Sequence, residues 1–261
     1  MTIKEYHAHP ALSRSRLWLL HESPQKFKWA EEHPEPPTAA FKLGAAFHKL
    51  ALEPETFDDE YAVAPSLDRR TKDGKALWEK FVHDTMGKEL LTYDEMETIA
   101  AMKVSLMANP TAKVLVEKGK KEQSFFWKEP NTGVDMKCRT DILLTDDVKC
   151  IVDLKSCSSA DTDTFTREVL RYGYDVQTAI YTEGVQQTHP GKYPFIFIAV
   201  EKTPPYAVNI METDPLVIEY GYIRYRELLD TYVECVKTGN WYGFNGAENV
   251  MNKIVLPAWV N

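Results

Sequence analysis

Two short apolar runs on either side of an acidic break constrain this chain more than any other stretch. They lie within residues 139–144 and 151–156, and the segment 145–149 between them is polar and acidic, as is typical of a hairpin connection. Because side chains alternate across a strand, Asp153 and Lys155 should share one face while the residue between them points to the other. The pattern predicts two strands that bring acidic and basic groups to one end of a sheet.

The residue types at this position suit a cation site. Asp141 and Asp153, with eleven residues between them, supply carboxylate oxygens, which are the ligands that Mg²⁺ and Mn²⁺ prefer. A bound cation also offsets the repulsion between two carboxylates. An acid followed two residues later by Lys is common on strand surfaces, so a solvated strand face is the alternative interpretation of this motif alone.

A third strand precedes the motif. Residues 121–127 have a strand pattern, Pro130–Gly133 a turn pattern, and 134–139 form the returning strand that leads into Asp141. The three strands are expected to form an antiparallel meander packed on helices. Glu122 could approach the acidic cluster, but a charged residue at a strand start is usually solvated.

A helix predicted over residues 43–53 carries His48. Its apolar residues recur at helical spacing, and the pattern ends before Pro54. A lone His beside an apolar stripe is usually structural, but a neutral imidazole can ligate a divalent cation if it reaches the carboxylates. Other helices are expected over 75–86, 93–108, 164–171 and 214–238 and from Pro110 and Tyr174, with a strand pair over 193–200 and 206–211.

The first helix opens with hydroxyl and guanidinium groups. Ser13 or Ser15 is a good N-cap, and Arg14 and Arg16 follow. A helix N-terminus with such groups can bind an anion, whereas the alternative is a capped amphipathic helix with two solvated arginines.

The helix that starts at Tyr174 carries an amide and a phenol on one face. Gln177 and Tyr181 are four residues apart, so they lie one above the other. Such a pair can orient a phosphate or a water molecule, or it can lie at the edge of the core.

Composition narrows the class of protein. A chain of 261 residues with 44% hydrophobic residues can bury a sizeable core, and one elaborated domain over 1–261 is expected. The net charge of −8 argues against a generic nucleic-acid binder without excluding a nuclease that has a local basic groove. No apolar run is long enough to span a membrane, no signal-peptide pattern opens the chain, and the four cysteines form no C-x-x-C pair, so reduced cysteines in the cytoplasm are expected.

Taken in order, these motifs resemble the RecE-type branch of the RecB-like PD-(D/E)XK nucleases, the phage recombination exonuclease VIII family. The resemblance covers nearly the whole chain, and its order is His, Asp, Asp-x-Lys and Gln-x-x-x-Tyr. It is carried by residues 6–13 with 23–24, 44–48 with 52–54, 137–141, 152–156, and 174–177 with Tyr181.

The resemblance implies an α/β (α+β) fold with a restriction-endonuclease-like core. A central mixed sheet flanked by helices would occupy residues 119–212 and carry the catalytic core. A mainly helical part, 1–118, would carry His48, and 213–261 would form a C-terminal helix and an aromatic tail.

It further implies a 5′→3′ exodeoxyribonuclease of bacterial or phage origin. Such an enzyme would degrade one strand of a linear duplex, leave 3′ overhangs and feed a RecT-type single-strand annealing protein. A ring-shaped homo-oligomer, trimer or tetramer, would encircle DNA and so retain an acidic protein on it. Iron–sulfur relatives carry a Cys where Ser23 stands here, so no iron–sulfur cluster is expected.

Site roles follow from the resemblance residue by residue. His48, Asp141, Asp153 and the Leu154 carbonyl would hold the Mg²⁺ or Mn²⁺ ions, two per site. Lys155 would position the attacking water and stabilise the charge of the phosphorane. The set is completed by residues that would contact the scissile phosphate, the water or the 5′-phosphate: Gln177, Tyr181, Ser13, Arg14 and Arg16.

Three other functions remain open at this stage. A non-ring endonuclease of the same fold would use the same cation site. A catalytically silent DNA-binding or assembly subunit should have lost at least one of the site residues, and none is missing. A binding protein without nucleic acid, carrying a solvated acidic cluster, is the third alternative.

Overall fold

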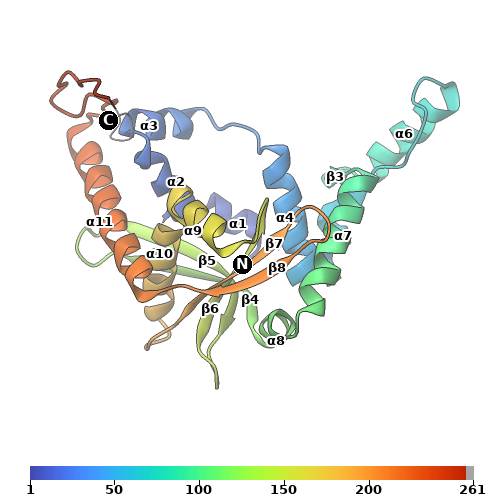
Figure 1. Ribbon diagram of the computed structural model, residues 1–261. Coiled ribbons are helices and arrows are strands. Elements are labelled where there is room, and N and C mark those ends of the chain that lie inside the picture. Colours follow the sequence, from blue (N-terminus) through green and yellow to red (C-terminus); the bar gives the residue numbers. More distant parts are fainter. Residues whose placement is uncertain (257–261) are drawn as a thin grey trace.

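One mixed sheet forms the centre of the computed structural model, which describes residues 1–256 (Figure 1). Neighbouring strands follow the order β1-β5-β6-β7-β8, and β4 pairs with the other edge of β5. Within this sheet β1–β5 and β6–β7 are parallel pairs, and the other pairs are antiparallel. The strands are β1 (Leu12–Ser13), β4 (Lys120–Lys128), β5 (Asp135–Leu144), β6 (Cys150–Cys157), β7 (Phe195–Glu201) and β8 (Val208–Glu212).

Helices cover both faces of this sheet (Figure 1). One core contains apolar side chains from α2 (Arg14–Trp18), α3 (Pro24–Glu32), α9 (Thr162–Arg171), α10 (Tyr174–Gln186) and α11 (Pro215–Thr238). The other contains side chains from α4 (Ala39–Leu52), α7 (Tyr93–Ala108) and α8 (Pro110–Lys118). The expected mixed sheet flanked by helices is therefore present.

Most expected elements occur close to their expected bounds. The meander β4–β5–β6 and the β7–β8 pair are present, and α7 spans Tyr93–Ala108 as predicted. Ser13 caps α2, Ser23 caps α3, and Asp214 caps α11, because each side chain accepts a hydrogen bond from a free N–H of the first turn. All four cysteines are buried and unpaired. Within residues 1–256 no helix combines the length and the apolarity needed to cross a membrane.

Several elements were not expected from the sequence. They include the short helices α1 (Ile3–Ala8) and α5 (Phe57–Glu60), and two 3₁₀ turns at Leu19–His21 and Pro54–Thr56. The strand β1 has only two residues, and it pairs in parallel with Met136 and Lys137 of β5. A separate two-stranded sheet joins β2 (Tyr61–Val63) to β3 (Glu89–Leu91).

The helix α6 (Lys72–Asp84) extends away from the body beyond β3 (Figure 1). Gly74 is its one buried residue, whereas Leu77, Val82 and the nearby Met86 are 54%, 42% and 77% exposed. A helix of this length gains little stability without tertiary packing, so these apolar side chains form a surface available to a partner.

The C-terminal segment after α11 packs partly on the body. Trp241 stacks on Phe27 with ring centroids 5.3 Å apart, and the Tyr242 carbonyl accepts a hydrogen bond from the Gln25 N–H. The side chains of 254–256 are exposed. The rest of the predicted aromatic tail, including Trp259, lies outside the described residues.

The side chains of β5 change from one face of the sheet to the other partway along the strand. Met136 and Cys138 belong to the core under α10 and α11, whereas Ile142 and Leu144 belong to the core under α4 and α7. Positions of equal parity should share one face of a regular strand. The reversal therefore falls between Cys138 and Ile142, where Asp141 lies, and it allows groups from both faces to reach that carboxylate.

Candidate active site

The strands β5 and β6 separate at Asp141. Their ladder pairs Ile142 with Val152 and is not continued to Asp153. The Leu154 N–H, which would otherwise face β5 without a partner, donates to Asp141 Oδ2 at 2.7 Å. A residue's N–H and C=O point to the same side of an extended strand, so the Leu154 carbonyl faces this opening as well. The split thus exposes a carboxylate and a carbonyl together.

Asp153 is the buried carboxylate of the site, with 2% of the residue exposed. Gln177 on α10 donates through Nε2 to Asp153 Oδ1, and the Lys155 ammonium forms an ion pair with Oδ2. Apart from that ion pair, Oδ2 has no hydrogen-bond partner among residues 1–256. The Lys155 ammonium also lies over the Tyr174 ring, 4.7 Å from its centroid.

His48 reaches the same opening from α4. Its Nδ1 is 3.5 Å from Asp141 Oδ2, the carboxylate oxygen that accepts from the Leu154 N–H. Burial lowers the pKa of His48, and the charge of Lys155 acts in the same direction. The imidazole is therefore neutral at ordinary pH, which is the form that ligates a cation. Gly44, one turn earlier, brings α4 close to β6, since a Cβ there would lie 3.1 Å from Ser156 Oγ.

The two carboxylates and the ammonium perturb one another. Burial raises the pKa of Asp141 to about 8, and the negative charge of Asp153 adds to this rise. Burial disfavours the charged form of Lys155, but the neighbouring carboxylates, Asp153 first, outweigh it and raise the pKa of that ammonium. Two carboxylates held together at such a cost are typical of a functional site.

These groups fit a hard divalent cation. Asp141, Asp153 and the Leu154 carbonyl offer oxygen atoms, His48 offers a neutral nitrogen, and Asp153 Oδ2 is a buried oxygen still short of a hydrogen-bond donor. Within residues 1–256, no group of three acidic, imidazole or thiol side chains is arranged to hold a metal ion as the side chains lie. Lys155 and Gln177 occupy the Asp153 oxygens instead. The donor set suits Mg²⁺ or Mn²⁺ better than a thiolate-binding metal.

Two further predicted residues, Arg14 and Tyr181, lie near this acidic centre. Arg14 is near enough to Asp153 for their charges to attract, its guanidinium lies 5.4 Å from the Tyr174 ring centroid, and it donates to the carbonyls of Tyr172 and Gly173. Tyr181 is next to the acidic pair, and burial raises its pKa well above its ordinary value.

Ser13 and Arg16 have structural partners. Ser13 caps α2 and contacts Ser15 Oγ at 3.1 Å. Arg16 forms an ion pair with Glu31 and donates to the Pro10 carbonyl at 2.9 Å. The structure therefore brings Arg14 toward the acidic centre and pairs Arg16 with Glu31 of α3.

The sequence left two alternatives for Glu122, an approach to the acidic cluster or a solvated side chain, and the structure favours the first. Its side chain is 19% exposed and accepts a hydrogen bond from Arg139 Nε at 2.6 Å. Its backbone has φ 53, a left-handed conformation that costs a non-glycine residue roughly 1–3 kcal/mol and that is enriched at functional sites. The predicted hairpin could have revealed this position, because Glu122 and Asp141 are equally far from the turn at Pro130–Gly133.

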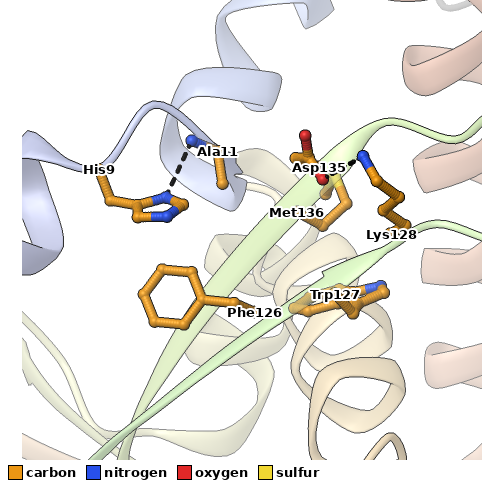
Figure 2. A pocket seen from close by; sticks show the side chains of 7 residues that line it. All are labelled: His9, Ala11, Phe126, Trp127, Lys128, Asp135 and Met136. Carbon is orange, nitrogen blue, oxygen red and sulfur yellow. Dashed lines mark hydrogen bonds and ion pairs between the residues drawn. The ribbon is translucent and has the colours of Figure 1, made fainter.

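A shallow pocket lies at the other end of the β4–β5 pair (Figure 2). His9 and Phe126 face each other across it with ring centroids 4.5 Å apart, and Lys128 pairs with Asp135 at 2.7 Å. Its lining residues are His9, Ala11, Phe126, Trp127, Lys128, Asp135 and Met136. None of the predicted site residues lines it, so it is separate from the acidic centre.

The split strands, with an acid on one, an acid-x-Lys on the next and helices on both faces, define a PDDEXK-like domain. Comparison with protein families agrees, because residues 13–251 match the family described as "PDDEXK-like domain of unknown function (DUF3799)". The chain belongs to this family. No protein of curated function matches it.

A solved structure supports the same fold. A structure named "Putative exonuclease" from Eubacterium rectale superposes with a TM-score of 0.66 at 16% identity, covering 98% of this chain and 94% of that one. A phage related exonuclease from Haemophilus somnus 129PT is more distant, with a TM-score of 0.34, 13% identity and coverage of 65% and 85% of the two chains. The first likeness supports the fold, and the second is too distant to support an inference.

Proposed function

We propose that this protein is a divalent-cation-dependent 5′→3′ exodeoxyribonuclease that acts on linear double-stranded DNA. It leaves 3′ single-stranded overhangs, which a RecT-type annealing protein would use in recombination. The convergence of His48, Asp141, Asp153 and Lys155 around the Leu154 backbone, on a PDDEXK-like fold, carries the proposal. The polarity and the recombination role come from the resemblance of the sequence to the exonuclease VIII family.

The side chains have distinct parts in this chemistry. His48, Asp141, Asp153 and the Leu154 carbonyl would hold the cations, which activate water and offset charge on the scissile phosphate when bound. Lys155 keeps its positive charge because of its carboxylate neighbours, so it stabilises the negative charge that develops on the phosphate. Gln177 fixes the orientation of Asp153, since its amide occupies Oδ1.

Linear and covalently closed circular duplexes separate the proposal from an endonuclease with the same cation site. An exonuclease needs a strand end, so with Mg²⁺ we expect degradation of the linear DNA and an intact closed circle. Linearising the circle with a restriction enzyme should restore degradation. Conversion of the closed circle into nicked or linear products would favour the endonuclease.

A ring-shaped homo-oligomer is part of the proposal. The exposed apolar residues Leu77 and Val82 on α6 support it, because little of this projecting helix is buried within the described chain. Contact with a second copy would bury these side chains and stabilise the helix.

Light scattering tests the contact. Leu77→Asp combined with Val82→Asp is expected to reduce the particle from a trimer or tetramer to a single chain of 29.9 kDa. Val148→Asp, at a 59% exposed position in the β5–β6 turn, is the matched control. An unchanged oligomer in the double variant would exclude α6 as the contact, and a monomeric wild type would exclude the ring.

A further inference from the structure

Glu122 lies on β4 directly across from Asp141. The β4–β5 register pairs Lys121 with Ile142 and Gln123 with Thr140, which places Glu122 opposite Asp141. The ladder has no bridge at this one position, where Glu122 adopts its left-handed backbone. Opposite residues of antiparallel strands are close enough for their side chains to interact.

Arg139 holds the Glu122 carboxylate. Its Nε donates to Glu122 Oε2 at 2.6 Å, and its Nη1 donates to Ser124 Oγ at 2.8 Å. The bond to Glu122 uses one carboxylate oxygen, so Oε1 is not held by this pair. Arg139 and Asp141 are two residues apart on the strand.

The charges of the site act on Glu122. Burial raises its pKa, and the negative charge of Asp141 raises it further, while a charged His48 would lower it. In turn, the charge of Glu122 favours the protonated form of His48. Three carboxylates around one opening repel each other, and a bound cation would offset this repulsion in addition to Lys155 and Arg139.

We propose that Glu122 is a third carboxylate of the cation site, next to Asp141 and His48. The inference deepens the proposed function and rests on its claim that this centre binds a divalent cation. Glu122 would add an oxygen donor from β4, on the side of Asp141 away from Lys155. In the structure the Glu122 carboxylate is paired with Arg139.

Calorimetric titration of the full chain with Mn²⁺, without DNA, tests this inference. Glu122→Gln keeps the size of the side chain and an oxygen that can accept from Arg139, but it removes the charge. We expect its Kd for Mn²⁺ to be at least about tenfold weaker than that of the wild type. Circular dichroism without cation should show the wild-type fold.

Asp135→Asn is the matched control, because this carboxylate lies on the paired strand β5 but is exposed and pairs with Lys128. It should bind Mn²⁺ with the wild-type Kd. A wild-type Kd for Glu122→Gln, or no Mn²⁺ binding by the wild type, would overturn the inference. DNA degradation is measured separately, so a protein that binds Mn²⁺ through Glu122 but degrades no DNA would refute the proposed function alone.

Discussion

Lys155→Met is expected to lower the rate of DNA degradation by about 10²–10³-fold, the usual effect of removing one group that stabilises charge in the transition state. Methionine keeps most of the volume of the side chain over Tyr174 but cannot carry charge. Removing the ammonium also removes the cation that competes for Asp153 Oδ2. The Kd for Mg²⁺ should therefore stay unchanged or become tighter while kcat falls.

The measurement is kcat and KM for linear duplex DNA at saturating Mg²⁺, together with a calorimetric Kd for the cation. A bound cation replaces the ammonium as the counter-charge of Asp153, so the variant should remain folded in this assay. Lys128→Met, which removes an ammonium that is 71% exposed, is the control and should retain full activity. A fall in cation affinity with kcat preserved would mean that Lys155 only organises the site.

Asp141→Asn should change stability and activity in opposite directions. In the cation-free protein, burial and the charge of Asp153 raise the pKa of Asp141 to about 8, against roughly 3.9 in an unfolded chain. A raised carboxyl pKa means that the folded state binds the proton more tightly. The contribution of Asp141 to the free energy of unfolding is therefore most favourable below about pH 4, and it declines progressively as the pH rises to about 8.

Replacing the carboxyl by an amide removes this loss. At pH 8 without cations we expect Asp141→Asn to be more stable than the wild type by about 2–4 kcal/mol, measured by urea unfolding, with the difference vanishing near pH 4. The same variant should lose cation binding and at least about 10²-fold in activity. Equal free energies of unfolding for the two proteins across this pH range would show that the surroundings of Asp141 do not raise its pKa.

Local patterns predicted the elements that hold the site. The alternation around Asp153 and Lys155, the helical spacing around His48 and the four-residue interval from Gln177 to Tyr181 depend on neighbouring residues alone. In the structure His48 lies next to Asp141, and Lys155 and Gln177 both contact Asp153. Helix caps and turns were predictable for the same reason, because a capping side chain and its N–H partners are adjacent in sequence.

Long-range contacts were not predictable in this way. The two-residue strand β1 exists only because β5 offers it a free edge beyond β6. Arg16 is held by Glu31, a partner on another helix, so its predicted role in anion binding could not be judged from helix capping alone. Glu122 looked like an ordinary strand-start acid until the register placed it opposite Asp141.

Degradation of a linear duplex that carries a 5′-phosphate and a different label on each strand end tests whether the protein is a 5′→3′ exonuclease. Wild type and Lys155→Met are compared with Mg²⁺ and with a chelator. We expect Mg²⁺-dependent release of the 5′ label before the 3′ label, and near-complete loss of this release in the variant. Intact DNA with both Mg²⁺ and Mn²⁺ would refute the proposed exonuclease and favour a silent DNA-binding subunit with the same fold.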